Sequence, residues 1–488
     1  MSVKQWLWPR WGVVLAMWAL CTSAHARDWE DIVTSPFVDP LLTRPRALDA
    51  GKILPGDTQA LGCDDNRYEP TTPIALAEAI DLALCHNPQV QSAWANIKVQ
   101  AAQVGEARAA YLPTITAGAS YLNQRTQYPE SQFQVNSDRT SLSRYYSLTW
   151  RLLDFGGRGA NRRSANALLE AALASHDAVL QKTMANVIGL YFDAQTARAG
   201  REAKEKNEAL ARQTFEAAKK RETRGAGAQS DTLQAQTSLA KAELEHARAI
   251  GAHEKSLVAL TVALGLQTEG EDAPGLVLAP DYQDEDRLLR QNLSEWLRLA
   301  REQHPAIVAA RAQLESAREK LTATRSEGLP TLDFAKSQYV NGRPSQGLTS
   351  MQTKESVIGV TLNIPLFEGF GRTYKVRGAQ AQIEIKEAEL RDTQIQVLGD
   401  VAKAYAEASS ALRNLQSSRR LLDAAQDARD NVQRKYDRGI ADILEMLNVQ
   451  SALADAGQER IRTLAEWRSA RLRLLAAAGE MGLWSVKR

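Results

Sequence analysis

The histidines of this chain could bind a metal ion or transfer protons, but their spacing predicts neither. Apart from His25 near the N-terminus, they are His86, His176, His246, His253 and His304. None belongs to a His-Glu-x-x-His pattern, and the cysteines and histidines lack the paired spacing of a zinc site. His246 and His253 are seven residues apart and could share a helix face. We interpret these two histidines as a pair exposed to solvent. Without a nucleophile elbow or paired catalytic carboxylates, we predict no enzyme activity, no metal and no cofactor.

A glycine-rich run, Gly156-Gly157-Arg158-Gly159, resembles a phosphate-binding loop in its glycine content. It lacks the Gly-Lys-Ser/Thr ending that holds nucleotide phosphates and their metal ion. A matching run, Gly369-Phe370-Gly371-Arg372, occurs at the equivalent place in the second half of the chain. We therefore predict that both runs are hinges at which a strand turns into a helix, and that neither binds ATP.

Two acidic residues, Asp231 and Glu445, are separated by the same interval as two Arg-Gly pairs, Arg224-Gly225 and Arg438-Gly439. Each is expected near the start of a helix, where a carboxylate that complements the helix dipole contributes about 0.3–1 kcal/mol. Alternatively, these residues form a ring of carboxylates at the narrow end of a trimeric tube, where they would attract cations and help to hold a gate. Asp442 fits either role, and the sequence leaves both interpretations open.

The elements that would position these residues occur twice. Leu112-Pro113-Thr114 recurs as Leu329-Pro330-Thr331, and Arg224-Gly225 recurs as Arg438-Gly439, at nearly equal offsets along the chain. Each copy has the same predicted order: a helical stretch interrupted by a proline, a β-hairpin, and a long helical hairpin with its turn at Arg-Gly. This order indicates an internal duplication, in which two pseudo-repeats build one elongated body.

The predicted organisation follows from this duplication and from the composition of the remaining segments. The expected segments are a signal peptide at 1–26, an extended N-terminal strap at 27–73, a first repeat at 74–270, a linker at 271–293, a second repeat at 294–480 and a short tail at 481–488. The β-hairpins are expected at 114–153 and 331–366, and the long helical hairpins at 156–265 and 370–478.

The N-terminal segment has the pattern of a secretory signal peptide. Lys4 and Arg10 precede an apolar run over 12–20, and Ala24-His25-Ala26 is a small-x-small cleavage pattern. In the alternative interpretation Cys21 would carry a lipid, but a large leucine precedes it where such sites have a small residue. Beyond this segment no run approaches the roughly 18–20 apolar residues of a spanning helix, so a membrane crossing would require strands.

Two cysteines, Cys63 and Cys85, remain after the signal peptide. In an oxidising compartment they could form a disulfide, which would close a loop of about 22 residues and stabilise the fold by roughly 3 kcal/mol. Such a bond would tether the strap to the first helix. The alternative is a pair of unrelated thiols.

Residues 356–366 alternate as a strand between lipid and water would. Their even positions are apolar and include Ile358, Val360, Leu362, Ile364 and Leu366. Residues 147–152 alternate likewise, whereas Lys336 interrupts the apolar side of a weaker partner strand. A soluble sheet packed on helices would show the same period of two. Spanning strands would need other copies of the chain, because four strands cannot close a barrel. A trimer would supply about twelve strands, which can.

Residues 156–222 and 370–437 contain no proline and are rich in helix-forming residues. At about 1.5 Å per residue, each would form a rod roughly 100 Å long. The periodicity alone fits a coiled-coil stalk as well as the wall of a tube. We favour the tube, because each rod continues directly from a predicted spanning strand.

Together these features resemble the TolC family of outer-membrane channel proteins. The similarity rests on the signal peptide, the Leu-Pro-Thr and Arg-Gly pairs and the strand–helix junctions at 152–156 and 365–369, and it covers about residues 74–480. It implies a mainly α-helical fold with a membrane β-barrel part. The implied assembly is a homotrimer that forms a barrel of about twelve strands in the outer membrane and a long α-helical barrel through the periplasm.

The resemblance also implies functional positions at the tips of the helical hairpins. Arg224-Gly225-Ala226 and Arg438-Gly439-Ile440 match the turns that dock a periplasmic adaptor, also called a membrane fusion protein. Glu445 and Asn448 fall where the family prototype has two gate acids, and the amide of Asn448 weakens the expected constriction. The implied partners are this adaptor, an inner-membrane ABC transporter or other pump, and outer-membrane lipid.

We predict a passive trimeric conduit for type I protein secretion, because the N-terminal strap resembles that of toxin exporters in this branch of the family. A multidrug or metal efflux channel would share the architecture and use another pump. A periplasmic coiled-coil scaffold would share the rods without the barrel. A nucleic-acid partner is not expected, because 60 Lys and Arg nearly balance 58 Asp and Glu.

Overall fold

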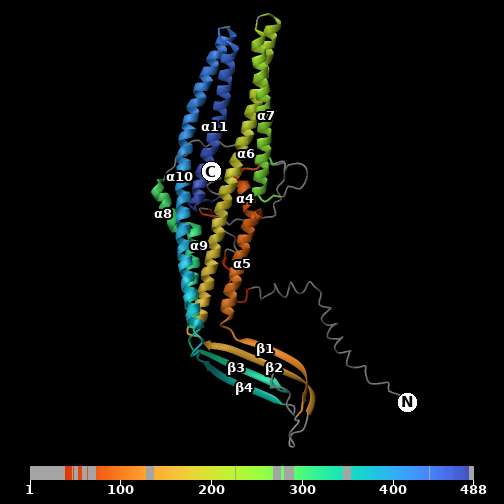
Figure 1. Cartoon of the computed structure of the whole chain (residues 1–488), viewed down its shortest axis with the longest axis vertical. Coiled ribbons are helices and arrows are strands. Elements are labelled where there is room, and N and C mark those ends of the chain that lie inside the picture. Colours follow the sequence, from red (N-terminus) through yellow and green to blue (C-terminus); the bar gives the residue numbers. More distant parts are fainter. Residues whose placement is uncertain are drawn as a thin grey trace, which may run out of the picture.

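The structure is a computed structural model, which describes residues 39–46, 48, 53–55, 57, 63, 73–127, 137–225, 227–266, 276–279, 291–343, 353–438 and 440–482. Long helices run along one axis, and a small sheet lies at one end of them (Figure 1). The expected signal peptide, most of the expected strap, and the tip residues Ala226 and Gly439 lie outside the described residues. The prediction of a mainly helical fold with a small strand part is confirmed.

The elements occur twice in the same order. The first set is α4 (Leu76–His86), α5 (Pro88–Ala109), β1 (Thr114–Thr126), β2 (Ser137–Leu153), α6 (Gly157–Thr223) and α7 (Gln229–Ala263). The second set is α8 (Leu293–Gln303), α9 (Pro305–Ser326), β3 (Thr331–Val340), β4 (Lys354–Asn363), α10 (Gly371–Asp437) and α11 (Ile443–Ala477). α6 and α10 both have 67 residues, and α7 and α11 both have 35, as an internal duplication predicts.

A proline separates the two short helices of each set, as the sequence predicted. Pro88 begins α5 and Pro305 begins α9, at the helix position where the N–H that proline lacks would have no partner. The residue before each proline caps the new helix. The Asn87 side chain accepts from the amide two residues later at 2.9 Å, and His304 Nδ1 accepts from its equivalent at 3.2 Å.

The four strands form one antiparallel sheet in the order β1-β2-β3-β4. The sequence predicted two hairpins, and the structure joins them because β2 of the first repeat pairs with β3 of the second. In this register Trp150 lies opposite Phe334, and Leu148 lies opposite Lys336. β1 and β4 are the edge strands of the described sheet.

The two faces of the sheet differ in polarity. Residues that pair across neighbouring strands point to the same face. What we call the apolar face includes Ile115, Leu148, Trp150, Phe334, Ile358, Val360 and Leu362. What we call the polar face includes Thr116, Ser147, Thr149, Asp333, Ser337 and Thr361. The apolar face is uncovered within the described chain, since Ile358 is 64% exposed and Val360 is 57% exposed. Lys336 lies on this face, as predicted.

Two large apolar clusters, and a smaller one between α6 and α7, hold the described helices together. The first joins α4, α6, α7 and α11 and includes Leu180 and Ile188. The second joins α8, α10 and α11 and includes Val401 and Trp467. α9 packs against both α6 and α10, so the two repeats share one helical body. None of the helices in the described ranges combines the length and the apolar composition needed to cross a membrane.

Described residues of the N-terminal strap contact the helical body through hydrogen bonds, through a disulfide, and through Leu54, which is buried in the first apolar cluster. Arg108 in the last turn of α5 donates from Nη1 to the carbonyl oxygens of Leu41 and Leu42, at 2.6 and 2.8 Å. Near the start of α5, Cys63 forms a disulfide with Cys85, which lies in the last turn of α4. The Cα atoms are 5.4 Å apart and the sequence separation is 22 residues. The strap is therefore fastened covalently to α4.

Candidate functional site

The tips of the two helical hairpins lie at the end of the molecule away from the sheet (Figure 1). In the first tip Arg224 follows α6, and Gly225 has a left-handed φ of 72°, which glycine adopts without steric cost. In the second tip Arg438 follows α10, and Ile440 is 72% exposed. Further exposed apolar residues near the starts of α7 and α11 are Leu233 and Leu444. The tips thus combine arginines with apolar side chains, a surface suited to a protein partner.

The acidic residues predicted for the constriction lie just behind the tips. Asp231 is the third residue of α7, and Glu445 is the third residue of α11. Asp442 caps α11, because its Oδ1 accepts from Glu445 N at 2.7 Å. Asn448 is exposed one turn farther along α11. Asp442 therefore has a structural function, whereas Asp231 and Glu445 place one carboxylate behind each tip.

A contact that sequence reasoning missed joins the two hairpins near their tips. The Arg221 guanidinium of α6 lies over the Tyr436 ring of α10, 4.6 Å from the ring centroid. A cation–π contact of this kind contributes about 0.5–1 kcal/mol at an exposed site. The two residues are not equivalent in the repeats, so the duplication could not reveal the pair. An aromatic residue just before an Arg-Gly turn was the available signal.

A charged network joins α6 to α7 below the first tip. His246 Nδ1 lies 2.8 Å from Glu208 Oε2, and Arg212 lies 2.9 Å from Glu208 and 2.8 Å from Glu243. The hydrogen bond with His246, followed by that with Arg212, lowers the pKa of the Glu208 carboxyl. The interpretation of His246 and His253 as a pair in solvent is wrong. His246 bonds to Glu208, and burial lowers the pKa of His253.

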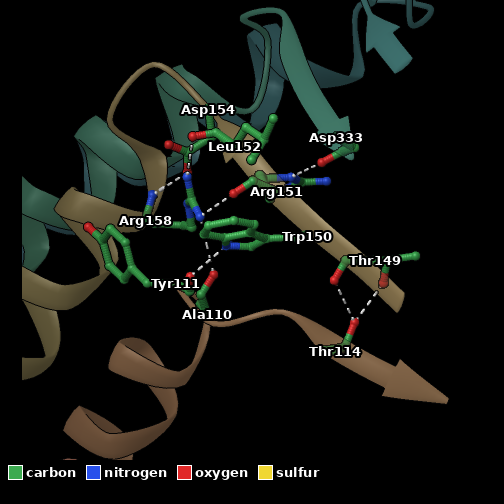
Figure 2. Close-up of polar contacts among 10 residues, drawn as sticks. All are labelled: Ala110, Tyr111, Thr114, Thr149, Trp150, Arg151, Leu152, Asp154, Arg158 and Asp333. Atoms are coloured by element: carbon green, nitrogen blue, oxygen red, sulfur yellow. Dashed lines mark hydrogen bonds and ion pairs between the residues drawn. The ribbon is translucent and has the colours of Figure 1, made fainter. Parts of the chain in front are cut away.

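At the first strand–helix junction, Arg158 binds the end of β2 to the start of α6 (Figure 2). Its guanidinium donates to the carbonyl oxygens of Arg151 at 2.7 Å and Leu152 at 3.2 Å. It also pairs with Asp154 at 3.2 Å, and the Asp154 carboxylate accepts from the Arg158 backbone N–H at 2.7 Å. These two side chains are only 13% and 15% exposed, so their charges depend on each other.

The same arginine reaches the end of α5, just before β1. Its Nη1 donates to the Ala110 carbonyl at 3.4 Å, and its guanidinium lies 4.9 Å from the centroid of the Tyr111 ring. Trp150 of β2 donates from Nε1 to the Tyr111 carbonyl at 2.9 Å (Figure 2). We call these contacts the Arg158 clasp. The glycine run is therefore a turn from strand to helix, as predicted, with a left-handed φ of 95° at Gly156.

The second junction repeats part of the clasp. Arg372 Nη1 donates to the Gly328 carbonyl at 2.9 Å and lies near Glu368, with Nε 3.7 Å from Oε2. A Cβ at Gly328 would overlap the Arg372 guanidinium, so the close approach depends on glycine. In the part of the chain that the structure describes, no group of three or more His, Cys, Asp or Glu side chains could hold a metal ion.

The sequence matches the profile of the outer membrane efflux protein family over residues 79–266 and 296–480. Protein CyaE of Bordetella pertussis is 36% identical over 409 residues, which cover 84% of this chain and 85% of that protein. The alkaline protease secretion protein AprF of Pseudomonas aeruginosa is 24% identical over 417 residues, with 84% and 85% covered. The proteases secretion protein PrtF of Dickeya chrysanthemi is 22% identical over 421 residues, with 84% and 88% covered.

Solved structures share this fold at low sequence identity. The CmeC outer membrane channel of Campylobacter jejuni has a TM-score of 0.71 and 18% identity, covering 88% of this chain and 94% of that one. The open state of the MtrE outer membrane channel of Neisseria gonorrhoeae has a TM-score of 0.68 and 19% identity, with 88% and 97% covered. At these identities the likeness shows a common fold.

Proposed function

This chain belongs to the outer membrane efflux protein family, and we propose that it is the outer-membrane channel of a type I protein secretion system. The observation that carries this proposal is the continuity between sheet and helices. A strand with one uncovered apolar face passes through the Arg158 clasp into a helix of 67 residues that ends at an exposed tip. Two relatives are named for the secretion of proteases, which favours protein as the cargo.

A homotrimer would supply the strands that one chain lacks for a closed barrel. The described sheet has four strands, and β1 and β4 are its edges. In lipid, each backbone group left unpaired along such an edge would cost several kcal/mol. Three copies joined edge to edge would provide about twelve strands, an even number within the range that bacterial barrels use. The apolar face would then meet outer-membrane lipid, and the helices would extend into the periplasm.

The energy for transport comes from partners in this proposal. The tips at Arg224, Gly225, Arg438 and Ile440 dock a periplasmic adaptor, which links the channel to an inner-membrane ABC transporter. Asp231 and Glu445 from three copies form the ring of carboxylates behind the tips, and the amide of Asn448 makes the constriction less acidic. The chain itself is a passive conduit and not an enzyme.

A second candidate is the outer-membrane channel of a multidrug or metal efflux pump. Outer membrane efflux protein BepC of Brucella suis is 26% identical over 393 residues, covering 78% of this chain and 81% of that protein. The architecture would be the same in both cases, because only the pump and the adaptor differ. Cross-linking in cells and identification of the captured pump separates the two functions.

The test of the proposal combines location, assembly and transport. We expect the protein in the outer-membrane fraction as a trimer that dissociates on heating, with single-channel conductance in planar bilayers. Deletion of its gene should abolish secretion of the protein that the captured pump exports, and the wild-type gene should restore it. A soluble monomer without conductance would reject the channel and support a periplasmic scaffold.

A further inference from the structure

Apart from Arg125, which pairs with Asp138, three cations of the described strands interrupt the apolar face of the sheet. Lys336 of β3 lies opposite Ile358 of β4, so it belongs to that face. Arg144 of β2 and Lys354 of β4 both lie opposite Val340 of β3, so they share the same face. All three cations are exposed. A charge on a lipid-facing surface of a barrel destabilises the protein unless it reaches the membrane interface or a counter-charge.

The described strands offer these cations no carboxylate on their own face. The acid on that face is Asp138, and it already pairs with Arg125 at 2.7 Å. Among the described residues, neither Arg144 nor Lys336 nor Lys354 forms an ion pair. On the described strands, the apolar face therefore has an excess of positive charge.

Charges on the polar face are arranged differently. Arg151 lies 2.9 Å from Asp333 on the neighbouring strand. Arg343, at the loop end of β3, pairs with Glu355 of β4. Among the described residues, arginines on the side that would face the channel interior have carboxylate partners, whereas the three cations of the apolar face have none.

Arg144 and Lys354 lie level with Val340 at the loop end of β3 and β4, away from the helices, whereas Lys336 lies in the middle of β3. Along β4, Leu362, Val360 and Ile358 precede Lys354 toward the loop, and along β2, Tyr146 lies between Leu148 and Arg144. Tyr146 is 56% exposed, and tyrosine is enriched where a membrane meets water. Arg144 and Lys354 are two strands apart, or roughly 10 Å. Long cationic side chains at this border can extend their charges to lipid headgroups.

We propose that Arg144, Lys336 and Lys354 form a binding surface for the phosphate groups of a multiply acylated, phosphorylated glycolipid in the outer leaflet of the outer membrane. This inference rests on the proposed function, which places the loop end of the sheet at the outer leaflet. The lysines would attract phosphate as point charges, and the Arg144 guanidinium would donate two hydrogen bonds. The acyl chains would pack on the neighbouring apolar rows.

The test measures binding of bisphosphorylated lipid A to the purified, detergent-solubilised trimer by native mass spectrometry. The variant R144Q/K336Q/K354Q removes the three charges. The matched control K98Q/K206Q/K255Q removes three exposed lysines from the helices. We expect binding to fall by at least about tenfold in the first variant and to remain unchanged in the control, since each cation near anionic lipid contributes about a fivefold effect. Fully dephosphorylated lipid A should bind the wild type as weakly as lipid A binds the variant.

Unchanged lipid A binding by R144Q/K336Q/K354Q would overturn the proposal. Equal binding of the phosphorylated and dephosphorylated lipids would also overturn it. So would a variant that keeps the glycolipid but loses a co-purifying outer-membrane protein. The charge-preserving variant R144K/K336R/K354R should retain binding. If the triple variant does not assemble, the single variants K336Q and K354Q decide the question by the same measurement. Conductance of the wild type is measured in parallel. If conductance is absent, the proposed channel function fails, whatever the result for lipid binding.

Discussion

His304 and Asn87 occupy the same place in the two repeats, yet only one of them can titrate. Each accepts a backbone hydrogen bond at the start of a helix that begins with proline. For His304 this requires a neutral ring with an unprotonated Nδ1. Burial lowers the pKa of His304 below its ordinary value of 6.5, and the Asp400 carboxylate partly opposes that shift. The second repeat thus has a cap that fails when it is protonated.

We expect the H304N variant to lose part of the acid sensitivity of the fold. Because the pKa of His304 is lowered in the folded state, this cap contributes its full stability to the fold above about pH 6.5. The contribution declines as the pH falls toward the folded pKa. Asparagine would keep the cap, as Asn87 does, without titrating. The measurement is the unfolding temperature at pH 7.5 and pH 5.5. H86N, which removes an exposed histidine, should keep the wild-type difference, and an unchanged difference in H304N would contradict the assignment.

At the tips, the two interpretations of the acidic residues predict different ion selectivity. If Asp231 and Glu445 line a constriction, D231N/E445Q should lower the cation preference and the block by divalent cations in planar bilayers. If they only complement helix dipoles, selectivity should stay the same and the helices should lose about 0.3–1 kcal/mol each. E384Q/D423N removes two exposed acids from α10 and is the matched control.

At the scale of the elements, the helical hairpins are held to each other near their ends by the Arg221–Tyr436 contact. The rest of α6 and α10 is joined through α9 and through apolar packing farther from the tips. Residues at the tips are more exposed than those near the middle of the helices. If the proposed channel opens by separation of its tips, a weak contact at this exposed end is where small energies would change the equilibrium between closed and open positions.

We expect Y436A to favour the open position of the hairpins. Loss of about 0.5–1 kcal/mol of cation–π attraction would raise the open population about two- to fivefold. Y436F keeps the aromatic ring and should behave as the wild type. The measurement is the open probability in single-channel recordings, and equal open probabilities for Y436A and Y436F would exclude the contact as a restraint.

The Arg158 clasp holds the end of β2 against the start of α6. R158A would remove bonds to two carbonyl groups at the end of β2 and leave Asp154 buried without its ion pair. We expect a loss of about 3 kcal/mol, because a buried charge without its partner is costly. R158K should recover little, since lysine lacks the planar fork. Thermal dissociation of the trimer measures the effect, and R162A, at an exposed arginine beside Tyr111, should have a small effect by comparison.

At the scale of the whole molecule, the disulfide fastens the strap to the helical body. Replacing both cysteines, C63S/C85S, should lower the stability by roughly 3 kcal/mol, because the open loop gains conformational freedom in the unfolded chain. Dithiothreitol should bring the wild type to the same unfolding temperature and should leave the variant unaffected. If the reductant shifts both proteins equally, its effect does not act through this bond.

The arrangement of the whole molecule was predictable where it follows from local order. The repeated Arg-Gly pairs, the prolines at 88 and 305 and the alternation along 356–366 all indicate elements that the structure contains. Strand alternation has a period of two and helices form over runs of suitable residues, so both can be recognised without knowledge of distant partners. The position of Lys336 on the apolar side followed from the same alternation.

By itself, then, the amino-acid order determined the duplication, the type of each element and the polarity of each strand. Only the tertiary structure decided that β2 pairs with β3, that Arg158 binds carbonyls of two elements, that His246 bonds to Glu208, and that Arg221 lies over Tyr436. Apart from the bonds of Arg158 to the end of β2, these contacts join residues far apart in the chain. Their partners depend on how twisted strands and long helices pack in space, which no period along the sequence records.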